Sequence, residues 1–211
     1  ITIPLDPTQT PGENAQRYFA KYNKQKRTFE ALTELIQETA DDIQYLESIS
    51  NALDIALSEA DLAQIKEELM QSGYIRRKHT KKKVKLTSKP MHYISSDGYD
   101  MYVGKNNLQN EELTFSFANG NDWWFHAKGA PGSHVIVKSG GDELPDRTFE
   151  EAGRLAAYYS KNRGADKVEI DYIQKKHVKK PNGAKPGFVV YYTNYSLVVD
   201  SDISNIKKVQ D

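Results

Sequence analysis

Residues 121–137 read NDWWFHAKGAPGSHVIV, a stretch that predicts two strands joined by a tight Gly-Ala-Pro-Gly turn. Successive side chains of a strand point to opposite faces of a sheet, so Trp123, Phe125 and Ala127 share one face. That face is apolar and suits a core. The opposite face carries the side chains of Asp122, Trp124, His126 and Lys128. We expect this second face to lie at the surface, because a core has no need of an imidazole and an ammonium in one row.

An exposed face of this composition can bind a nucleic acid, since an aromatic ring stacks on bases and cations neutralise phosphates. We expect Trp124 to be the stacking residue. In the alternative, Trp124 lies at the edge of the core and Trp123 is the exposed indole. His126 and His134 lie on neighbouring strands, where they could donate to phosphate or a 2′-hydroxyl, flank a metal ion with Asp122, or simply fix the hairpin.

The charge of the chain is balanced overall but unevenly placed. Its 211 residues have a formal net charge of zero, which excludes a globally basic nucleic-acid binder. Two segments, 71–90 and 172–199, contain basic residues and no acid. Their cations are Arg76, Arg77, Lys78, Lys81, Lys82, Lys83, Lys85 and Lys89 in the first, and Lys175, Lys176, Lys179, Lys180 and Lys185 in the second. A single run of this kind is usually a solvated loop, but two runs beside an aromatic strand favour a surface that binds a polyanion.

The residue types that are missing restrict the chemistry. The absence of cysteine excludes disulfides, thiolate metal sites and cysteine nucleophiles, and fits a cytoplasmic protein. No apolar run has the length of a membrane span, so membrane insertion is not expected. The chain starts at Ile1 rather than methionine, which suggests a piece of a longer protein.

The N-terminal third predicts a long helical hairpin. Thr10, Pro11 and Glu13 form a helix-start signal, and Ser58 with Asp61 begins a shorter helix that stops at Gly73. A seven-residue apolar repeat, typical of a coiled coil, runs through the first helix. Its two series are Ala15, Tyr22, Phe29, Ile36, Ile43 and Leu57, and Tyr18, Leu32, Leu46 and Leu53. The first helix is the longer one, so part of its seam needs a missing domain, a second copy of the chain through self-association, or a large assembly; a purely structural spacer is the alternative.

The remainder predicts a compact α+β domain with a mainly antiparallel sheet. The predicted strands outside 121–138 are 91–95, 100–104, 168–173, 188–193 and 195–199, and the predicted helices are 106–118 and 148–162. The 175–187 segment reads as a loop without a hydrophobic pattern. The fold class is therefore α+β, with a coiled-coil region at 1–75, a basic linker at 76–90 and the compact domain at 91–211.

Several motifs in this order resemble the NFACT family, also called the fibronectin-binding-protein-A-like family. They are VGKNN (103–107) with Gln109 and Asn110, Trp124-x-His126, PGSHV (131–135), AYYS (157–160), KKPNGAKPG (179–187) and YYTNY (191–195). The resemblance covers the coiled-coil middle region and an RNA-binding NFACT-R domain from about Met91.

The resemblance implies a cytoplasmic factor that binds tRNA and the large ribosomal subunit when a peptidyl-tRNA is stalled there. In the family, this binding supports a C-terminal alanine-rich tail that marks the product for degradation. Some Gram-positive members are described as fibronectin- or fibrinogen-binding adhesins at the cell surface, which is the alternative function. The resemblance also leads us to expect that the family's N-terminal NFACT-N and helix-hairpin-helix domains, implicated in tRNA selection, are missing from this sequence.

The candidate RNA-binding residues combine the strand face, the VGKNN motif and the second basic run. They are Lys105, Asn106, Asn107, Trp124, His126, Lys128, Ser133, His134, Lys175, Lys179, Lys180 and Lys185. The VGKNN motif is not a P-loop, because it lacks the upstream glycine and the Ser/Thr after lysine. Ser133 and His134 are adjacent without a nucleophile elbow, so a hydrolase is not expected. We expect no catalytic residue, metal or cofactor; a metal-dependent hydrolase at the two histidines is the remaining hypothesis.

Overall fold

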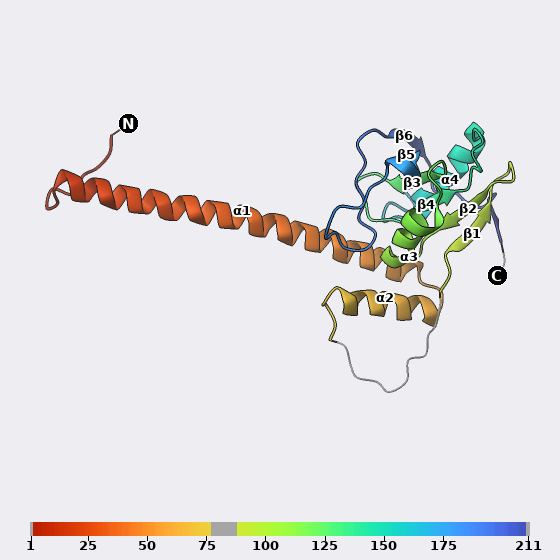
Figure 1. Cartoon of the computed structure of the whole chain (residues 1–211), viewed down its shortest axis with the longest axis horizontal. Helices are drawn as coiled ribbons and strands as arrows, with labels where there is room; N and C mark the ends of the chain where they lie inside the picture. The colour runs from red at the N-terminus through yellow and green to blue at the C-terminus, as the bar shows by residue number, and fades with distance from the viewer. Residues whose placement is uncertain (1, 77–87, 210–211) are drawn as a thin grey trace. The chain divides into compact units, whose positions relative to one another are not determined.

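The computed structural model describes residues 2–76 and 88–209 (Figure 1). By its internal contacts the chain divides into two compact units, Ile1–Gln44 and Tyr45–Asp211. Most of the predicted basic linker, 76–90, lies outside the described residues. The three-region division of the sequence stays a prediction.

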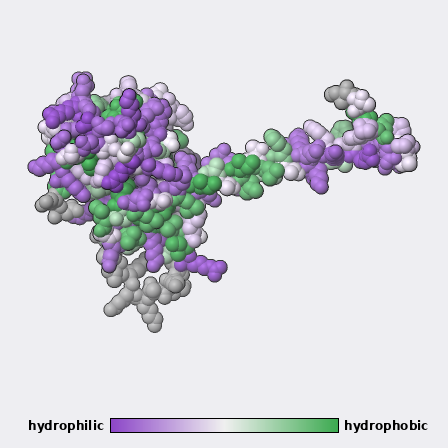
Figure 2. Space-filling view, turned by 180° about the vertical axis from the view of Figure 1, so that it is seen from behind, coloured by the Kyte–Doolittle hydropathy of each residue, from purple (hydrophilic) through white to green (hydrophobic). Residues whose placement is uncertain are grey.

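The long helix α1 spans Pro11–Ile55 and starts as its sequence predicts. The Glu13 carboxylate accepts a hydrogen bond from the Thr10 backbone N–H at 2.7 Å, while the Thr10 hydroxyl accepts one from the Glu13 N–H at 3.3 Å. Large apolar side chains of the first unit are exposed along α1 (Figure 2). They are Phe19, Tyr22, Phe29, Leu32, Leu35, Ile36 and Ile43.

In the second unit, the end of α1 and helix α2 (Glu59–Gln71) form the predicted antiparallel hairpin. Ser58 and Asp61 cap α2 reciprocally, and the chain leaves the helix through Gly73 at φ 82°. The hydrophobic cluster of the hairpin contains the buried residues Tyr45, Ile49, Ala52 and Ile65.

The face that α2 covers is not the predicted seam. Leu46, Leu53 and Leu57 stay 42–76% exposed, because Tyr45, Ile49 and Ala52 form a second stripe at helical spacing and α2 packs on that one.

The compact domain is built on an antiparallel sheet in the order β6-β5-β3-β4-β2-β1-β7. Its strands are β1 (Met91–Ile94), β2 (Asp100–Val103), β3 (Trp123–Ala127), β4 (Val135–Val137), β5 (Val168–Gln174), β6 (Tyr195–Val199) and β7 (Lys207–Lys208). The predicted α+β class is confirmed. The predicted strand at 188–193 is wrong: that segment makes only one bridge, between Val190 and Lys179. The short β7 was not predicted.

Both faces of the sheet are covered. Helix α4 (Asp146–Tyr158) packs on the face that carries Phe125 and Ala127. It approaches closely at Gly153, where an added Cβ would come 2.7 Å from the Leu197 side chain. The other face lies under α3 (Asn107–Glu112), a π-helical turn at Leu113–Phe117, and the chain that follows β5.

Candidate nucleic-acid interface

Trp124 lies in a second core. The predicted alternation along β3 is correct, but the Trp124 side chain has no exposed surface, so its prediction as a surface stacking residue is wrong. Its neighbours in the sheet are Ile136 on β4 and Ile173 on β5. The Tyr191 ring lies over it, with 5.1 Å between ring centroids. Trp123, on the opposite face, is the half-buried indole.

The segment after β5 causes this burial. It reads as a lysine-rich loop, yet Val178, Val189 and Tyr191 all pack into the cluster around Trp124. The segment is held in place by the bridge between Lys179 and Val190 and by the Tyr191 hydroxyl, which donates to Asp171 at 2.9 Å. Three apolar side chains spread over fourteen residues have no strand or helix period, so the pattern did not reveal this layer.

His126 and His134 face the same side, with ring centroids 5.4 Å apart. The Nδ1 of His134 lies 2.8 Å from the Thr114 hydroxyl, and its side chain is 2% exposed. Burial lowers the pKa of His126 to about 4 and also holds the pKa of His134 well below its ordinary value, with His126 adding to the effect. Neutral, packed imidazoles fit the interpretation in which they fix the hairpin.

The described residues contain no group of three or more His, Cys, Asp or Glu placed to hold a metal ion. Nor is any helix in the described ranges both long and apolar enough to cross a membrane.

The VGKNN motif joins the hairpin to the compact domain instead of facing solvent. The Lys105 ammonium lies 3.0 Å from the Asp61 carboxylate. Burial opposes ionisation of Asp61, but hydrogen bonds from Ser88, Leu57, Lys105 and Ser58 lower its pKa to about 2.

The two asparagines of the motif are buried at the same junction. Asn106 caps α3 and donates to Gln64 at 2.9 Å, while Asn107 donates to Ser48 at 2.7 Å and to Glu68 at 2.8 Å. Burial raises the pKa of Glu68. The surface positions predicted for Lys105, Asn106 and Asn107 are therefore wrong. Ser133 is also buried, at 1% exposure.

The remaining candidates are lysines of differing availability. Lys128 is exposed and paired with Glu169. Lys180 lies 2.7 Å from both carboxylate oxygens of Glu111. Lys185 donates to the Tyr74 hydroxyl at 2.9 Å and sits 4.6 Å from the Tyr45 ring centroid. Lys175 is half-buried, 5.9 Å from the Phe115 ring centroid.

Two lysines that follow β5 differ from the acid-paired lysines above in having no acidic partner among the described residues. Lys176 and Lys179 are exposed, and no acid of the described residues pairs with either ammonium. The motif-based candidates omitted Lys176, although the acid-free run around it was a signal. We call residues 175–185 the basic segment. Its Val178 packs into the cluster around Trp124, while Lys176 and Lys179 are exposed to solvent.

The basic segment is stiffened by Pro181 and by the two residues that directly follow the segment, Pro186 and Gly187. Pro181 and Pro186 fix backbone angles, and Gly187 fits against Asn107, where an added Cβ would come 2.9 Å from the amide oxygen. A preordered segment loses little conformational freedom when it binds, so its lysines can meet a row of phosphates at low entropic cost.

The chain matches two known protein-family descriptions, which together cover residues 1–193. Residues 89–193 match the family described as the NFACT protein RNA binding domain, and residues 1–88 match NFACT N-terminal and middle domains. The chain belongs to the NFACT family. In this NFACT chain the basic segment, the Trp124 core and the VGKNN motif itself lie within the matched RNA-binding domain, while the partners of the motif in the helical hairpin lie in the 1–88 match.

Similar proteins of known name include two from bacteria. The Rqc2 homolog RqcH of Streptococcus pneumoniae is 46% identical over 211 residues, and that of Bacillus subtilis is 42% identical over 215 residues. All of this NFACT chain is matched, but it spans only 38% and 37% of those proteins. A solved structure, the C-terminal part of the fibronectin/fibrinogen-binding protein from Streptococcus suis, is similar with a TM-score of 0.84 at 43% identity. That similarity covers 95% of this chain and 81% of the other.

Proposed function

We propose that this chain is the RNA-binding part of a ribosome-associated quality control factor. In this proposal it binds tRNA and the large ribosomal subunit where a peptidyl-tRNA is stalled, and the whole protein supports C-terminal alanine tailing in the cytoplasm. The observation that carries the proposal is the coincidence of the matched RNA-binding domain with an exposed, acid-free basic segment. The names of the RqcH relatives point to the same process.

The chemistry we propose for the basic segment is phosphate neutralisation. Exposed ammonium groups displace counterions from an RNA backbone, which gives affinity that depends strongly on salt and little on sequence. Lys176 and Lys179 are suited to this because neither pairs with an acid in the described part of the chain. Lys180 is a weaker contributor, since it would have to exchange Glu111 for phosphate.

We further propose that the chain acts by binding and not by catalysis, and that the chemistry of tailing occurs at the ribosome. Fibronectin binding, the property named for the Streptococcus suis protein, is not the function we propose. The RNA-binding function is supported by a domain match over residues 89–193, whereas fibronectin binding is supported only by the name of that similar protein.

Co-sedimentation tests the proposal. The purified chain is mixed with large subunits that carry peptidyl-tRNA, and with salt-washed empty subunits, and the bound fraction is measured in the pellet. We expect more chain to pellet with the peptidyl-tRNA complexes. The Lys176→Ala/Lys179→Ala variant should lose several-fold in the bound fraction, because two phosphate contacts are removed.

A matched control is Lys66→Ala/Lys167→Ala, which removes two exposed lysines of the same compact unit outside the basic segment. This variant should pellet like the unmodified chain. Equal pelleting with and without peptidyl-tRNA would contradict the proposed recognition of stalled complexes. Failure to pellet with either, beside saturable binding to immobilised fibronectin, would replace the proposal with the adhesin function.

A further inference from the structure

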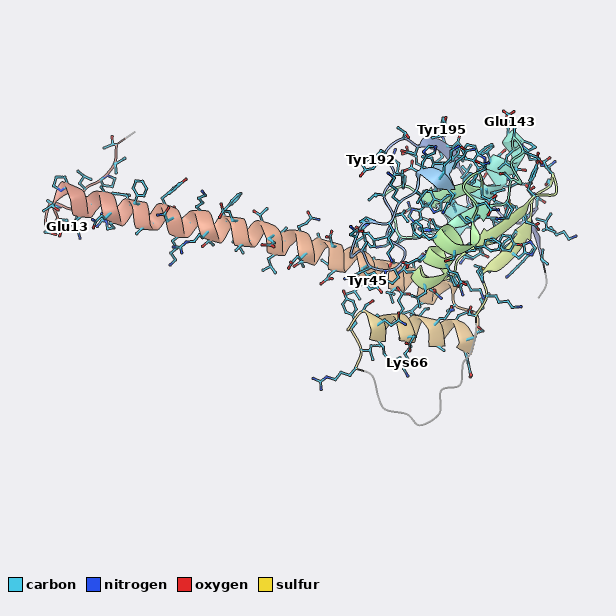
Figure 3. The ribbon with its side chains drawn as sticks, in the orientation of Figure 1. Glu13, Tyr45, Lys66, Glu143, Tyr192 and Tyr195 are labelled. Carbon is cyan, nitrogen blue, oxygen red and sulfur yellow. The ribbon has the colours of Figure 1, made fainter. Side chains whose placement is uncertain are left out.

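A pocket of about 410 Å³ lies where β3 and β6 begin, beside the segment that leads into α4. Trp123 is the first residue of β3 and Tyr195 the first residue of β6, while Glu143 belongs to the segment before α4. Tyr195 and Glu143, both labelled in Figure 3, line this pocket. None of these residues belongs to the basic segment, and RNA binding by Lys176 and Lys179 leaves the pocket unused.

Aromatic rings form one wall of the pocket. The Trp123 ring centroid lies 5.8 Å from that of Tyr172 and 6.4 Å from that of Tyr195. Tyr172 and Tyr195 are stacked, with centroids 5.5 Å apart and an angle of 28° between their planes. Tyr195 is 62% exposed even though its ring stacks on that of Tyr172. Its ring face is therefore available to a ligand.

Carboxylates form the opposite rim. Asp142, Glu143 and Asp146 line the pocket and are exposed. Among the described residues none of these three carboxylates accepts a hydrogen bond or pairs with a cation, and the neighbouring Arg147 is paired with Glu151 at 3.4 Å. The pocket thus combines the negative faces of aromatic rings with three carboxylates that pair with no cation of the described residues.

We propose that this pocket binds the arginine or lysine side chain of a basic protein segment. A guanidinium or ammonium over an aromatic face is attracted by the ring quadrupole, and the carboxylates on the rim supply acceptors for its N–H groups. A phosphate would meet three like charges in the same place, so an RNA backbone is disfavoured there. The compact unit therefore has two surfaces of opposite preference: the basic segment for RNA, and this acidic aromatic pocket for a cationic protein.

An adjoining pocket of about 460 Å³ makes an RNA base the main alternative ligand for the aromatic wall. It shares Trp123, Gln174 and Tyr195 with the first pocket and has no carboxylate in its lining. A base stacked on the shared aromatic wall from this side would use Tyr195 without meeting the acids. The experiment must therefore distinguish a cation from a base.

Calorimetric titration of the whole chain with three probes makes this distinction. The probes are a capped peptide of alternating arginine and serine, the same peptide with neutral citrulline in place of arginine, and a uridine dodecamer. We expect the arginine peptide to bind more tightly than the citrulline peptide. The Asp142→Asn/Glu143→Gln/Asp146→Asn variant, which keeps side-chain shape and removes charge, should weaken arginine-peptide binding by about fivefold or more.

Two exposed tyrosines provide a matched test of the aromatic wall. Tyr195→Ser should weaken arginine-peptide binding, whereas Tyr192→Ser, which removes an 84% exposed tyrosine outside the pocket lining, should not. Equal affinity for the arginine and citrulline peptides, no measurable peptide binding, or an unchanged affinity in the triple variant would overturn the proposal. Loss of uridine binding but not of peptide binding in Tyr195→Ser would assign the wall to RNA bases instead.

Discussion

Trp124, His126 and His134 form a packed cluster within the RNA-binding domain. The Trp124 and His126 rings are nearly parallel at 5.7 Å, and the His134 ring meets Trp124 edge-on at 5.1 Å. With the burial of Trp124 and His134, these contacts leave neither of those two rings open to a base. The two histidines instead couple the stability of the domain to pH, because burial disfavours their charged forms.

We predict that the domain loses stability as the pH falls from 7 to 5. An unfolded histidine takes up a proton near pH 6.5, while His126 in the folded chain stays neutral until about pH 4. Within this window the unfolded state binds more protons, so lowering the pH favours unfolding by about 1.4 kcal/mol per pH unit for a histidine of this kind. Guanidinium unfolding curves at pH 7, 6 and 5 measure this slope.

The variant His126→Gln separates the contribution of one histidine from that of Glu68. Because the pKa of Glu68 is raised in the folded chain, lowering the pH towards 4.5 favours folding through Glu68, which is opposite to the effect of the histidine. Its free energy of unfolding should change less between pH 7 and 5 than that of the unmodified chain. The control His177→Gln removes an exposed histidine and should keep the original slope. Identical slopes in all three proteins would show that His126 does not carry the effect.

For single residues, the sequence predicts which side chains share a face of the sheet but not which segment covers that face. The alternation from Trp123 to Ala127 follows from strand geometry alone. The burial of Trp124 depends on Val178 and Tyr191, some fifty to seventy positions away, in a segment without periodicity. Polar motif residues such as Asn107 were assigned to RNA because nothing local shows that Ser48 and Glu68 would meet them.

Helix α1 presents two apolar stripes, and the hairpin uses only one of them. Local signals at Thr10 and Ser58 define where the helices start, since capping depends on neighbours in sequence. The choice of stripe is a tertiary effect: α2 covers Ile49, while Leu53, one turn further along, stays 48% exposed. The heptad series therefore predicts the long helix correctly, while the coiled coil and its partner stay predictions.

We predict that Ile49→Ala lowers the free energy of unfolding of the hairpin and compact domain by about 2–4 kcal/mol, because it leaves a cavity in the buried stripe. The matched variant Leu53→Ala, on the same helix, should cost less than about 1 kcal/mol in the isolated chain. Denaturant unfolding followed by tryptophan fluorescence compares them. Comparable losses in the two variants would mean that the exposed stripe is covered in solution.

The whole molecule separates charge in a way that its zero net charge conceals. In the basic segment, Lys176 and Lys179 pair with no acid of the described residues, whereas the pocket beside Trp123 is rimmed by carboxylates that pair with no cation of the same residues. The family, the fold class and the acid-free run around Lys176 were all accessible from sequence. The pocket was not, because its residues come from four separated segments that meet only in the folded domain.

The most direct test of the account is a salt titration of tRNA binding by the unmodified chain and three variants. The slope of log affinity against log salt should become shallower by about one unit per removed lysine in Lys176→Ala/Lys179→Ala. It should stay unchanged in Lys66→Ala/Lys167→Ala and in Trp124→Phe, which keeps the core aromatic. An unchanged slope in the Lys176/Lys179 variant, or a folded Trp124→Phe variant that no longer binds tRNA, would contradict the basic segment as the RNA-binding surface.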